Sequence, residues 1–228
     1  QIPQVCFLQS LQRLPGDNCK NRKVFRTTFH QGTKYRDFVR GLIPVPSSDS
    51  VKFEVSKGLL WQAAEYAKQP DSAALLIIDE INRGNMSKIF GELLMLIEKD
   101  YRGTKATLAY NGLSFSVPKN LYIIGMMNTA DRSLAMIDYA LRRRFSFFEV
   151  EPGFDSEGFI HYQNGLNNET LNELINKVKD LNREITLDKS LGKGFCIGHS
   201  YFCGRDVCTE EWLHSIVDYD ILPMLSEY

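Results

Sequence analysis

The stretch Ala74–Arg83, with the sequence ALLIIDEINR, constrains the fold of this chain more than any other. Five consecutive apolar residues run directly into two carboxylates, Asp79 and Glu80. An apolar run without alternation is typical of a strand buried on both faces, as in a parallel sheet between helices. Ligands of such sheets bind beyond the carboxyl ends of the strands. The stretch therefore predicts a buried parallel strand whose tip lies at a ligand site.

Other segments predict the elements around this strand. Leu121–Met127 and Phe145–Val150 are also apolar at successive positions and predict two further buried strands. Periodicity and turn residues predict the remaining elements: strands over Val24–Phe29 and Val51–Val55, a loop over Pro44–Ser48, helices over Tyr35–Arg40, Lys57–Lys68 (capped by Ser56), Ser87–Asp100 and Ser133–Leu141, and a β-hairpin turning at Asn111-Gly112.

The hydrophobic pattern of the sequence changes after Glu151-Pro152-Gly153, from apolar strand-like runs to helical periodicity. Two long amphipathic helices are predicted there, over Glu169–Ile185 and over Thr209–Leu225, the second with Leu222 among its inward residues. We therefore expect an α/β domain over residues 1–152 and a mostly helical domain over residues 153–228.

The composition is that of a soluble globular protein of 228 residues. Its 27 Lys and Arg against 28 Asp and Glu leave a net charge of −1, which argues against general polyanion binding. A local basic run remains, either a solvated face or a phosphate-contacting patch: Lys20, Arg22, Lys23 and Arg26. No run approaches the ~20 apolar residues of a membrane span, and no secretory signal is visible. A cytoplasmic protein is expected.

The five cysteines are odd in number and irregular in spacing, which indicates reduced thiols. One group could hold zinc, namely Cys196, His199, Cys203 and Cys208. Its spacing matches no common zinc motif, so ordinary thiols are favoured over a metal site.

Asp79 and Glu80 have two interpretations. Adjacent carboxylates at a strand tip repel each other, and a bound Mg²⁺ would offset that repulsion. An Asp that holds Mg²⁺ through water and a Glu that activates a water are what phosphoanhydride hydrolysis requires. Alternatively, Asp79 caps a helix and Glu80 is merely solvated.

Two further polar groups follow apolar or helical segments. Asn128 ends the Leu121–Met127 strand, and its amide could hold a water in line with a γ-phosphate, with Asp131 positioning it. Either residue could instead cap the next helix. Arg142, Arg143 and Arg144 either complement a helix dipole or reach a neighbouring subunit's phosphate.

These segments together resemble the AAA+ motor domain of the McrB family, the GTP-hydrolysing subunits of modification-dependent restriction systems. The resemblance rests on LLIIDEINRGNMSKIFGELLMLIE, IIGMMNTADRSLAMIDYALRRRFSFFEVEPGF and LGKGFCIGHSYF. It implies an αβα sandwich core with a parallel sheet, followed by a small helical lid. It also implies a homo-oligomeric ring, expected to be a hexamer, with nucleotide between subunits. A McrC-like nuclease is the implied partner, and DNA is recognised by a separate N-terminal domain.

The resemblance also implies roles for individual residues. They are Asp79 as Mg²⁺ and nucleotide ligand, Glu80 as its Walker B partner, Asn128 as sensor, Asp131 as its companion, Arg143 and Arg144 as fingers acting on a neighbour, Arg132 as a further finger, and His199 and Ser200 as lid residues facing GTP or ATP. Family members often carry a basic residue at the position of Cys196, so a charge contact there is in doubt.

No G-x-x-x-x-G-K-[ST] loop occurs in the chain, so the phosphate cradle of such enzymes is missing. Either the chain is a fragment, as its start at Gln1 suggests, or it is a degenerate ring subunit. By itself the chain is then expected to be inactive. Three functions follow: a GTP-hydrolysing motor, an ATP-using remodelling relative, or a non-hydrolysing ring subunit that supplies arginines to its neighbours.

Overall fold

The computed structural model describes residues 5–8, 20–46, 51–108, 112–128 and 144–228, and the chain divides into two compact units. The described parts of 5–127 and 144–149 form the α/β unit, and residues 128 and 150–228 belong to the helical unit. The division at 152 and 153 inferred from the sequence stays a prediction.

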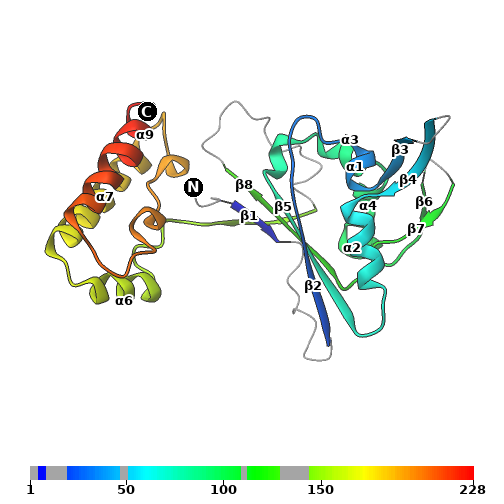
Figure 1. Ribbon diagram of the computed structural model, residues 1–228, viewed down its shortest axis with the longest axis horizontal. Coiled ribbons are helices and arrows are strands. Elements are labelled where there is room, and N and C mark those ends of the chain that lie inside the picture. Colours follow the sequence, from blue (N-terminus) through cyan, green and yellow to red (C-terminus); the bar gives the residue numbers. More distant parts are fainter. Residues whose placement is uncertain (1–4, 9–19, 47–50, 109–111, 129–143) are drawn as a thin grey trace. The chain divides into compact units, whose positions relative to one another are not determined.

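A five-stranded sheet is the centre of the α/β unit (Figure 1). β5 lies between β2 and β8 and is parallel to both, which confirms the predicted α/β fold with a parallel sheet. β1 lies between β8 and β9 and runs antiparallel to both. The order across the sheet is β2 (Asn21–Thr28), β5 (Ser72–Asp79), β8 (Leu121–Met127), β1 (Val5–Leu8) and β9 (Ser146–Glu149).

The two faces of this sheet are buried to different extents. Leu76 and Ile78 are fully buried on the face covered by α2 (Leu59–Ala67), whereas Leu75 and Ile77 on the opposite face are only half-buried. The predicted burial of β5 is therefore complete on one face and only partial on the other. The reason is that the short helices lie with α2 on one side of the sheet (Figure 1): α1 (Tyr35–Phe38), α3 (Met86–Phe90) and α4 (Leu93–Leu96).

The helix predicted over Ser87–Asp100 is interrupted at Gly91. This glycine has φ +53°, and a Cβ there would lie 3.1 Å from the ring of Tyr35. The left-handed conformation ends α3 and starts a new direction in α4, which is followed by the 3₁₀ turn η2 (Lys99–Tyr101). The inward residues predicted for this segment are nevertheless all buried: Ile89, Leu93, Leu96 and Ile97.

The loop predicted over Pro44–Ser48 is instead partly a strand. β3 (Arg40–Pro46) pairs antiparallel with β4 (Val51–Lys57) in a separate two-stranded ribbon. Proline is tolerated on such edge strands because its missing N–H faces solvent. Ser56 lies in β4 and does not cap α2, whose N-cap is Gly58.

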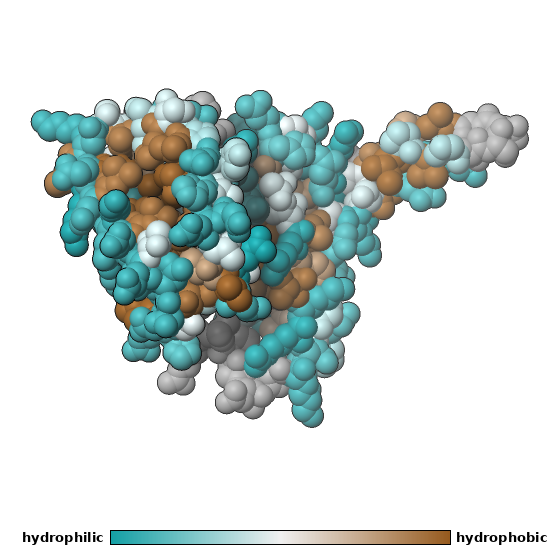
Figure 2. Space-filling model, turned by 60° about the vertical axis from the view of Figure 1, so that its left-hand side comes forward, coloured by the Kyte–Doolittle hydropathy of each residue, from teal (hydrophilic) through white to brown (hydrophobic). Residues whose placement is uncertain are grey.

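One face of this ribbon is apolar and open to solvent, as the brown side chains of the projecting arm in Figure 2 show. Direct pairing of Leu42 with Val55 and of Pro44 with Phe53 puts these side chains on the same face. Phe53 is 63% exposed. A second, shorter ribbon pairs β6 (Ala106–Thr107) with β7 (Ser114–Phe115), in line with the predicted hairpin; Asn111 lies outside the described residues.

The strand predicted over Phe145–Val150 is present as β9, but of its predicted buried residues only Phe145, which directly precedes β9, is buried. Every residue of Ser146–Glu149 is exposed, including Phe147 and Phe148. The position of β9 at the edge of the sheet explains the exposure. The helix predicted over Ser133–Leu141 lies outside the described residues.

Two polar side chains hold the amino end of β8: Arg102 ties it to the end of α4, and Asn120 ties it to the amino end of β5. Arg102 donates from Nε to the carbonyl of Ile97 (3.0 Å) and from Nη1 to those of Pro118 (3.1 Å) and Leu121 (2.9 Å). Burial lowers the pKa of Arg102 to about 10. Asn120 donates from Nδ2 to the carbonyls of Ala67 and Ser72. These bonds lie at the end of the sheet opposite to the carboxyl ends of β5 and β8.

The helical unit packs around its own apolar core, which includes Phe154, Ile175, Phe202, Ile216 and Ile221. Side-chain caps start its three main helices: Ser156, Asn168 and Thr209 each accept a backbone N–H. The elements are α6 (Glu157–Leu166), α7 (Glu169–Leu187), η3 (Lys193–Phe195), η4 (His199–Phe202), α8 (Glu210–Ser215), the π-turn η5 (Ile216–Ile221) and α9 (Leu222–Leu225).

The last predicted helix is therefore one helical run with a π-turn inside it. Leu222, expected to point inward, is 53% exposed. The π-turn explains the difference, because one extra residue in the turn rotates everything after it. None of the helices formed by the described residues is long and apolar enough to cross a bilayer.

Candidate functional site

Asp79 and Glu80 lie where the sequence predicts them, at the carboxyl end of β5. Ile78 pairs with Gly125, so the end of β5 and the end of β8 meet at the same edge of the sheet. Asn128 directly follows β8. The turn η1 (Ile81–Arg83) lies against β8 at this edge. The parallel pairing thus brings the two carboxylates to the end of the strand that Asn128 follows.

Glu80 has a backbone conformation that a non-glycine residue rarely adopts. Its φ of +50° and ψ of +43° lie in the left-handed region. The Asp79 Oδ1 atom accepts the Glu80 N–H at 3.0 Å, and the Glu80 carbonyl accepts the Arg83 N–H at 2.9 Å. Such strain persists only where the surroundings impose it, and it collects at functional sites.

The Glu80 carboxylate is oriented by Arg83. Glu80 Oε2 and Arg83 Nε are 3.0 Å apart, and the Glu80 side chain is 27% exposed. The carboxylate is thus held in place by an ion pair and is still accessible to water. A group that accepts a proton from a water molecule needs this access.

The chain after the turn is packed tightly. A Cβ on Gly84 would come 2.5 Å from Cδ1 of Ile89, so only glycine fits there without a shift. Asn85 then caps α3, its side chain accepting the Lys88 N–H at 2.9 Å. The close packing of Gly84 and the cap at Asn85 thus hold the segment that follows Glu80 in one conformation.

Asn82 is a residue that the sequence reasoning missed. Its Oδ1 atom is buried, and within the described part of the chain it has no hydrogen-bond partner. A buried acceptor without a donor is costly and calls for a water or ligand. Only its place two residues after Glu80 could have signalled it.

Three predicted site residues lie outside the described residues: Asp131, Arg132 and Arg143. Arg144 is described, and it bonds within its own chain. Its Nε donates to the Leu94 carbonyl at 3.0 Å, and Nη2 lies 2.7 Å from Glu98 Oε1. The side chain is 11% exposed. Arg144 therefore ties the start of β9 to α4.

His199 lies in the helical unit and is bonded there. Its Nδ1 accepts the Gly153 N–H at 2.9 Å, and its ring stands edge-on to Phe154 and Phe159. Burial lowers the pKa of His199. The neutral ring with a proton on Nε2 is the form that this hydrogen bond requires. Ser200 follows it in η4.

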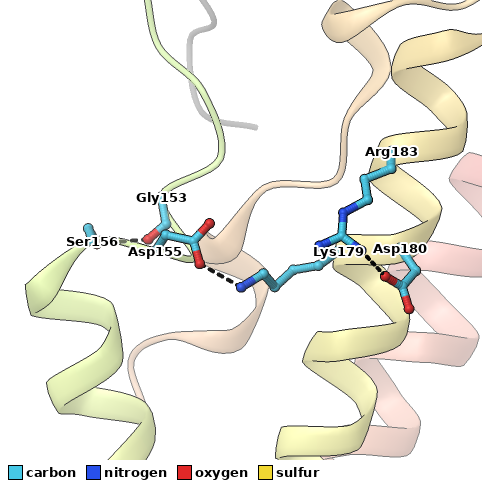
Figure 3. A network of polar contacts seen from close by, with 6 residues as sticks. All are labelled: Gly153, Asp155, Ser156, Lys179, Asp180 and Arg183. Carbon is cyan, nitrogen blue, oxygen red and sulfur yellow. Dashed lines mark hydrogen bonds and ion pairs between the residues drawn. The ribbon is translucent and has the colours of Figure 1, made fainter.

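Further contacts dock residues 151–156 onto the helical unit (Figure 3). Lys179 Nζ lies 2.5 Å from Asp155 Oδ1, and Lys193 Nζ lies 2.7 Å from Glu151 Oε1. Ser156 Oγ donates to the Gly153 carbonyl at 2.7 Å. The segment that enters the helical unit is thus fixed at several points, with His199 at its centre.

Cys196, Cys203 and Cys208 are free thiols in this structure. Cys203 Sγ donates to the His199 carbonyl, and burial raises the pKa of Cys203 and of Cys208. Cys196 contacts Thr186 on α7. Across the described ranges, no three His, Cys, Asp or Glu side chains are grouped to hold a metal ion.

Asp79 nevertheless fits a Mg²⁺ that arrives with a nucleotide. Its Oδ1 is engaged by the Glu80 N–H, whereas Oδ2 accepts no hydrogen bond from the described residues. Mg²⁺ usually binds one or two carboxylates and completes its shell with water and phosphate oxygens. One free carboxylate oxygen is sufficient for that arrangement.

Two protein families match the two parts of the chain. Residues 9–145 match the AAA domain of the dynein-related subfamily, and residues 173–228 match the α-helical lid domain of McrB. The fold and the tip of β5 are thus those of an AAA-type protein with a lid. The chain belongs to the McrB family of AAA+ proteins.

Two curated relatives are components of restriction enzymes. The chain is 46% identical to the EcoKMcrB subunit of the type IV methyl-directed restriction enzyme of Escherichia coli K12, over 94% of this chain and 49% of that protein. It is 33% identical to YdiS, a component of the type II restriction enzyme BsuMI of Bacillus subtilis 168, over 34% of this chain and 26% of that protein. The chain thus spans about half the length of the first relative, and its match covers about a quarter of the second.

Among solved structures, a candidate ATPase of Cytophaga hutchinsonii aligns with a TM-score of 0.37 and 14% identity. The alignment covers 64% of this chain and 38% of that one.

The left-handed conformation of Glu80 predicts a conflict between stability and function. Glu80→Gly and Glu80→Ala both remove the contact with Arg83, but only glycine relieves the backbone. We expect the glycine variant to be more stable than the alanine variant by about 1 kcal/mol, measured by urea unfolding. Equal stability of the two variants would contradict the assigned backbone conformation.

The environment of His199 predicts a pH effect on the helical unit. Because burial lowers its folded-state pKa, the unfolded chain takes up the proton first as the pH falls. The contribution of neutral His199 is therefore complete above its unfolded pKa near 6.5 and is lost below it. Calorimetric melting between pH 7.5 and 5.5 should show a larger fall for the unmodified protein than for His199→Asn, whose oxygen can still accept. His214→Asn, at an exposed position, should behave like the unmodified protein.

Proposed function

We propose that this chain is the nucleotide-hydrolysing part of a McrB-type restriction motor, with GTP as its substrate. The observation that carries the proposal is the tip of β5, where a strained Glu80 and a hydrogen-bonded Asp79 lie beside the end of β8. Membership of the AAA+ family supports nucleotide and Mg²⁺ as ligands. The identity of the base, GTP rather than ATP, rests on the resemblance to McrB.

Each residue at this edge has a role in the proposed reaction. Asp79 holds the water shell of Mg²⁺, and the metal, when bound, offsets phosphate charge. Glu80, oriented by Arg83, accepts a proton from the attacking water. Asn128 fixes that water in line with the γ-phosphate, because an amide donates and accepts without changing charge. The unsatisfied oxygen of Asn82 suits a second ordered water.

The arginines act between subunits in this proposal. Arg144 already bonds Glu98 and Leu94 in its own chain, so we assign it to anchoring and give Arg143 the role of the finger that reaches a neighbour's phosphate. Asp131 positions Asn128, and Arg132 is a second candidate for the finger. His199 and Ser200 place the lid over the nucleotide.

The assembly follows from the same proposal. The subunits form a cytoplasmic ring, a hexamer by resemblance, which drives a McrC-like nuclease. DNA is recognised by a domain outside this chain. The restriction enzyme components among the relatives support this setting.

The test is Glu80→Gln in the complete protein with its nuclease partner. Loss of the base should lower GTP turnover at least about 100-fold and leave GTP binding unchanged. Glu54→Gln, an exposed carboxylate on the ribbon, is the control and should turn over normally. Retained turnover in Glu80→Gln would overturn the assignment, and effective competition by ATP would overturn GTP specificity.

A further inference from the structure

Two exposed surfaces, one on each unit, have complementary patterns. The first is the β2 edge, defined as Arg22, Val24 and Arg26. The second is the 218–220 bulge, defined as Asp218, Tyr219 and Asp220. The first alternates cation, apolar residue and cation, and the second alternates anion, aromatic residue and anion.

β2 is an edge strand of the sheet that the described residues form. Because side chains alternate along a strand, the three residues of the β2 edge share one face. Lys23 is turned to the other face, over the rings of Phe25 and Tyr66 at 5.1 and 5.6 Å. Val24 is 51% exposed, and both arginines are exposed without an ion-pair partner in the described part of the chain. The edge thus presents two unpaired cations around an apolar centre.

The 218–220 bulge is a product of the π-turn η5. Ile216 and Ile221 are both buried, at 3% and 5% exposure, although they are five residues apart. The wider turn forces the residues between them outward, and three consecutive ones are exposed. Tyr219 is 80% exposed, which is unusual for so large a ring. Neither aspartate has an ion-pair partner among the described residues.

The charge of the chain is divided in the same sense. Residues 153–228 contain six Lys and Arg against thirteen Asp and Glu, a net charge of −7. The remaining residues contain 21 against 15, a net charge of +6, and the two together give the −1 of the whole chain. The acidic part of one molecule is therefore attracted electrostatically to the basic part of another.

From these observations we infer that the 218–220 bulge of one copy of this chain docks on the β2 edge of a second copy. Arg22 and Arg26 are about 13 Å apart along the strand, which leaves room for the Tyr219 ring over Val24 between them. Each aspartate then pairs with one arginine. The two patches differ, so the contact is heterologous, the type that closes into rings. The inference rests on the ring of the proposed function and names its contact.

A second copy suits the β2 edge better than a nucleic acid does. Two exposed arginines separated by an apolar side chain offer few phosphate contacts, whereas DNA binding draws on many. The exposed valine has no partner on a phosphate backbone but has one in a tyrosine ring. An opposite surface of matching pattern is present in the chain itself.

Charge reversal in the complete protein tests the inference. The core variant is Arg22→Glu with Arg26→Glu, and the lid variant is Asp218→Lys with Asp220→Lys. Each variant alone should lose nucleotide-dependent assembly, at least about 10-fold in the concentration needed, by mass photometry. An equimolar mixture of the two should assemble again, because each reversed patch then meets its opposite on the other variant. Restoration by mixing requires a contact between molecules.

Matched reversals elsewhere control for net charge. Lys88→Glu with Lys99→Glu and Glu173→Lys with Glu184→Lys change exposed residues by the same amounts and should assemble normally. The inference is overturned if the two test variants assemble normally, if mixing fails to restore assembly, or if the core variant loses DNA binding instead. GTP turnover of the unmodified protein, measured in parallel, shows separately whether the proposed function fails.

Discussion

The parallel pairing of β5 with β8 is the constraint on which the rest of the site depends. Their register, with Ile78 opposite Gly125, puts Asp79 and Glu80 at the edge where β8 also ends. Arg102 and Asn120 secure the amino ends of the same strands by bonding backbone carbonyls. A shift of one residue would turn the buried and half-buried faces over and move the carboxylates away from the edge. The position of the two carboxylates is therefore set by the register of β5 with β8.

The sequence was sufficient to predict the strand, its tip and the residues of the tip, because apolar run and carboxylates are local signals. It was not sufficient for the backbone of Glu80, since glutamate has no preference for the left-handed region. Asn82 was missed for a similar reason: an unsatisfied oxygen is a property of packing, not of composition. The strand β3 was missed because two prolines in seven residues are typical of loops, and only its place in an isolated ribbon permits them.

Two further differences come from helix phase and strand position. Apolar periodicity continues across Gly91, so it indicated burial correctly but hid the break. The π-turn before Leu222 shifts the phase by one residue, which exposes a leucine predicted to be inward and pushes Tyr219 outward. Phe147 and Phe148 looked buried by composition, but their exposure depends on whether β9 has a neighbour. Local patterns identify elements, whereas the partners of each element decide burial.

The central claim is that the tip of β5 acts on the γ-phosphate of a bound nucleotide. The most direct measurement is a structure of the complete protein with Mg²⁺ and a non-hydrolysable GTP analogue. The account predicts Mg²⁺ with its water shell on Asp79 and a water held between Glu80, Asn128 and the γ-phosphate. A nucleotide bound with its γ-phosphate away from this edge, with both carboxylates facing solvent, would contradict it.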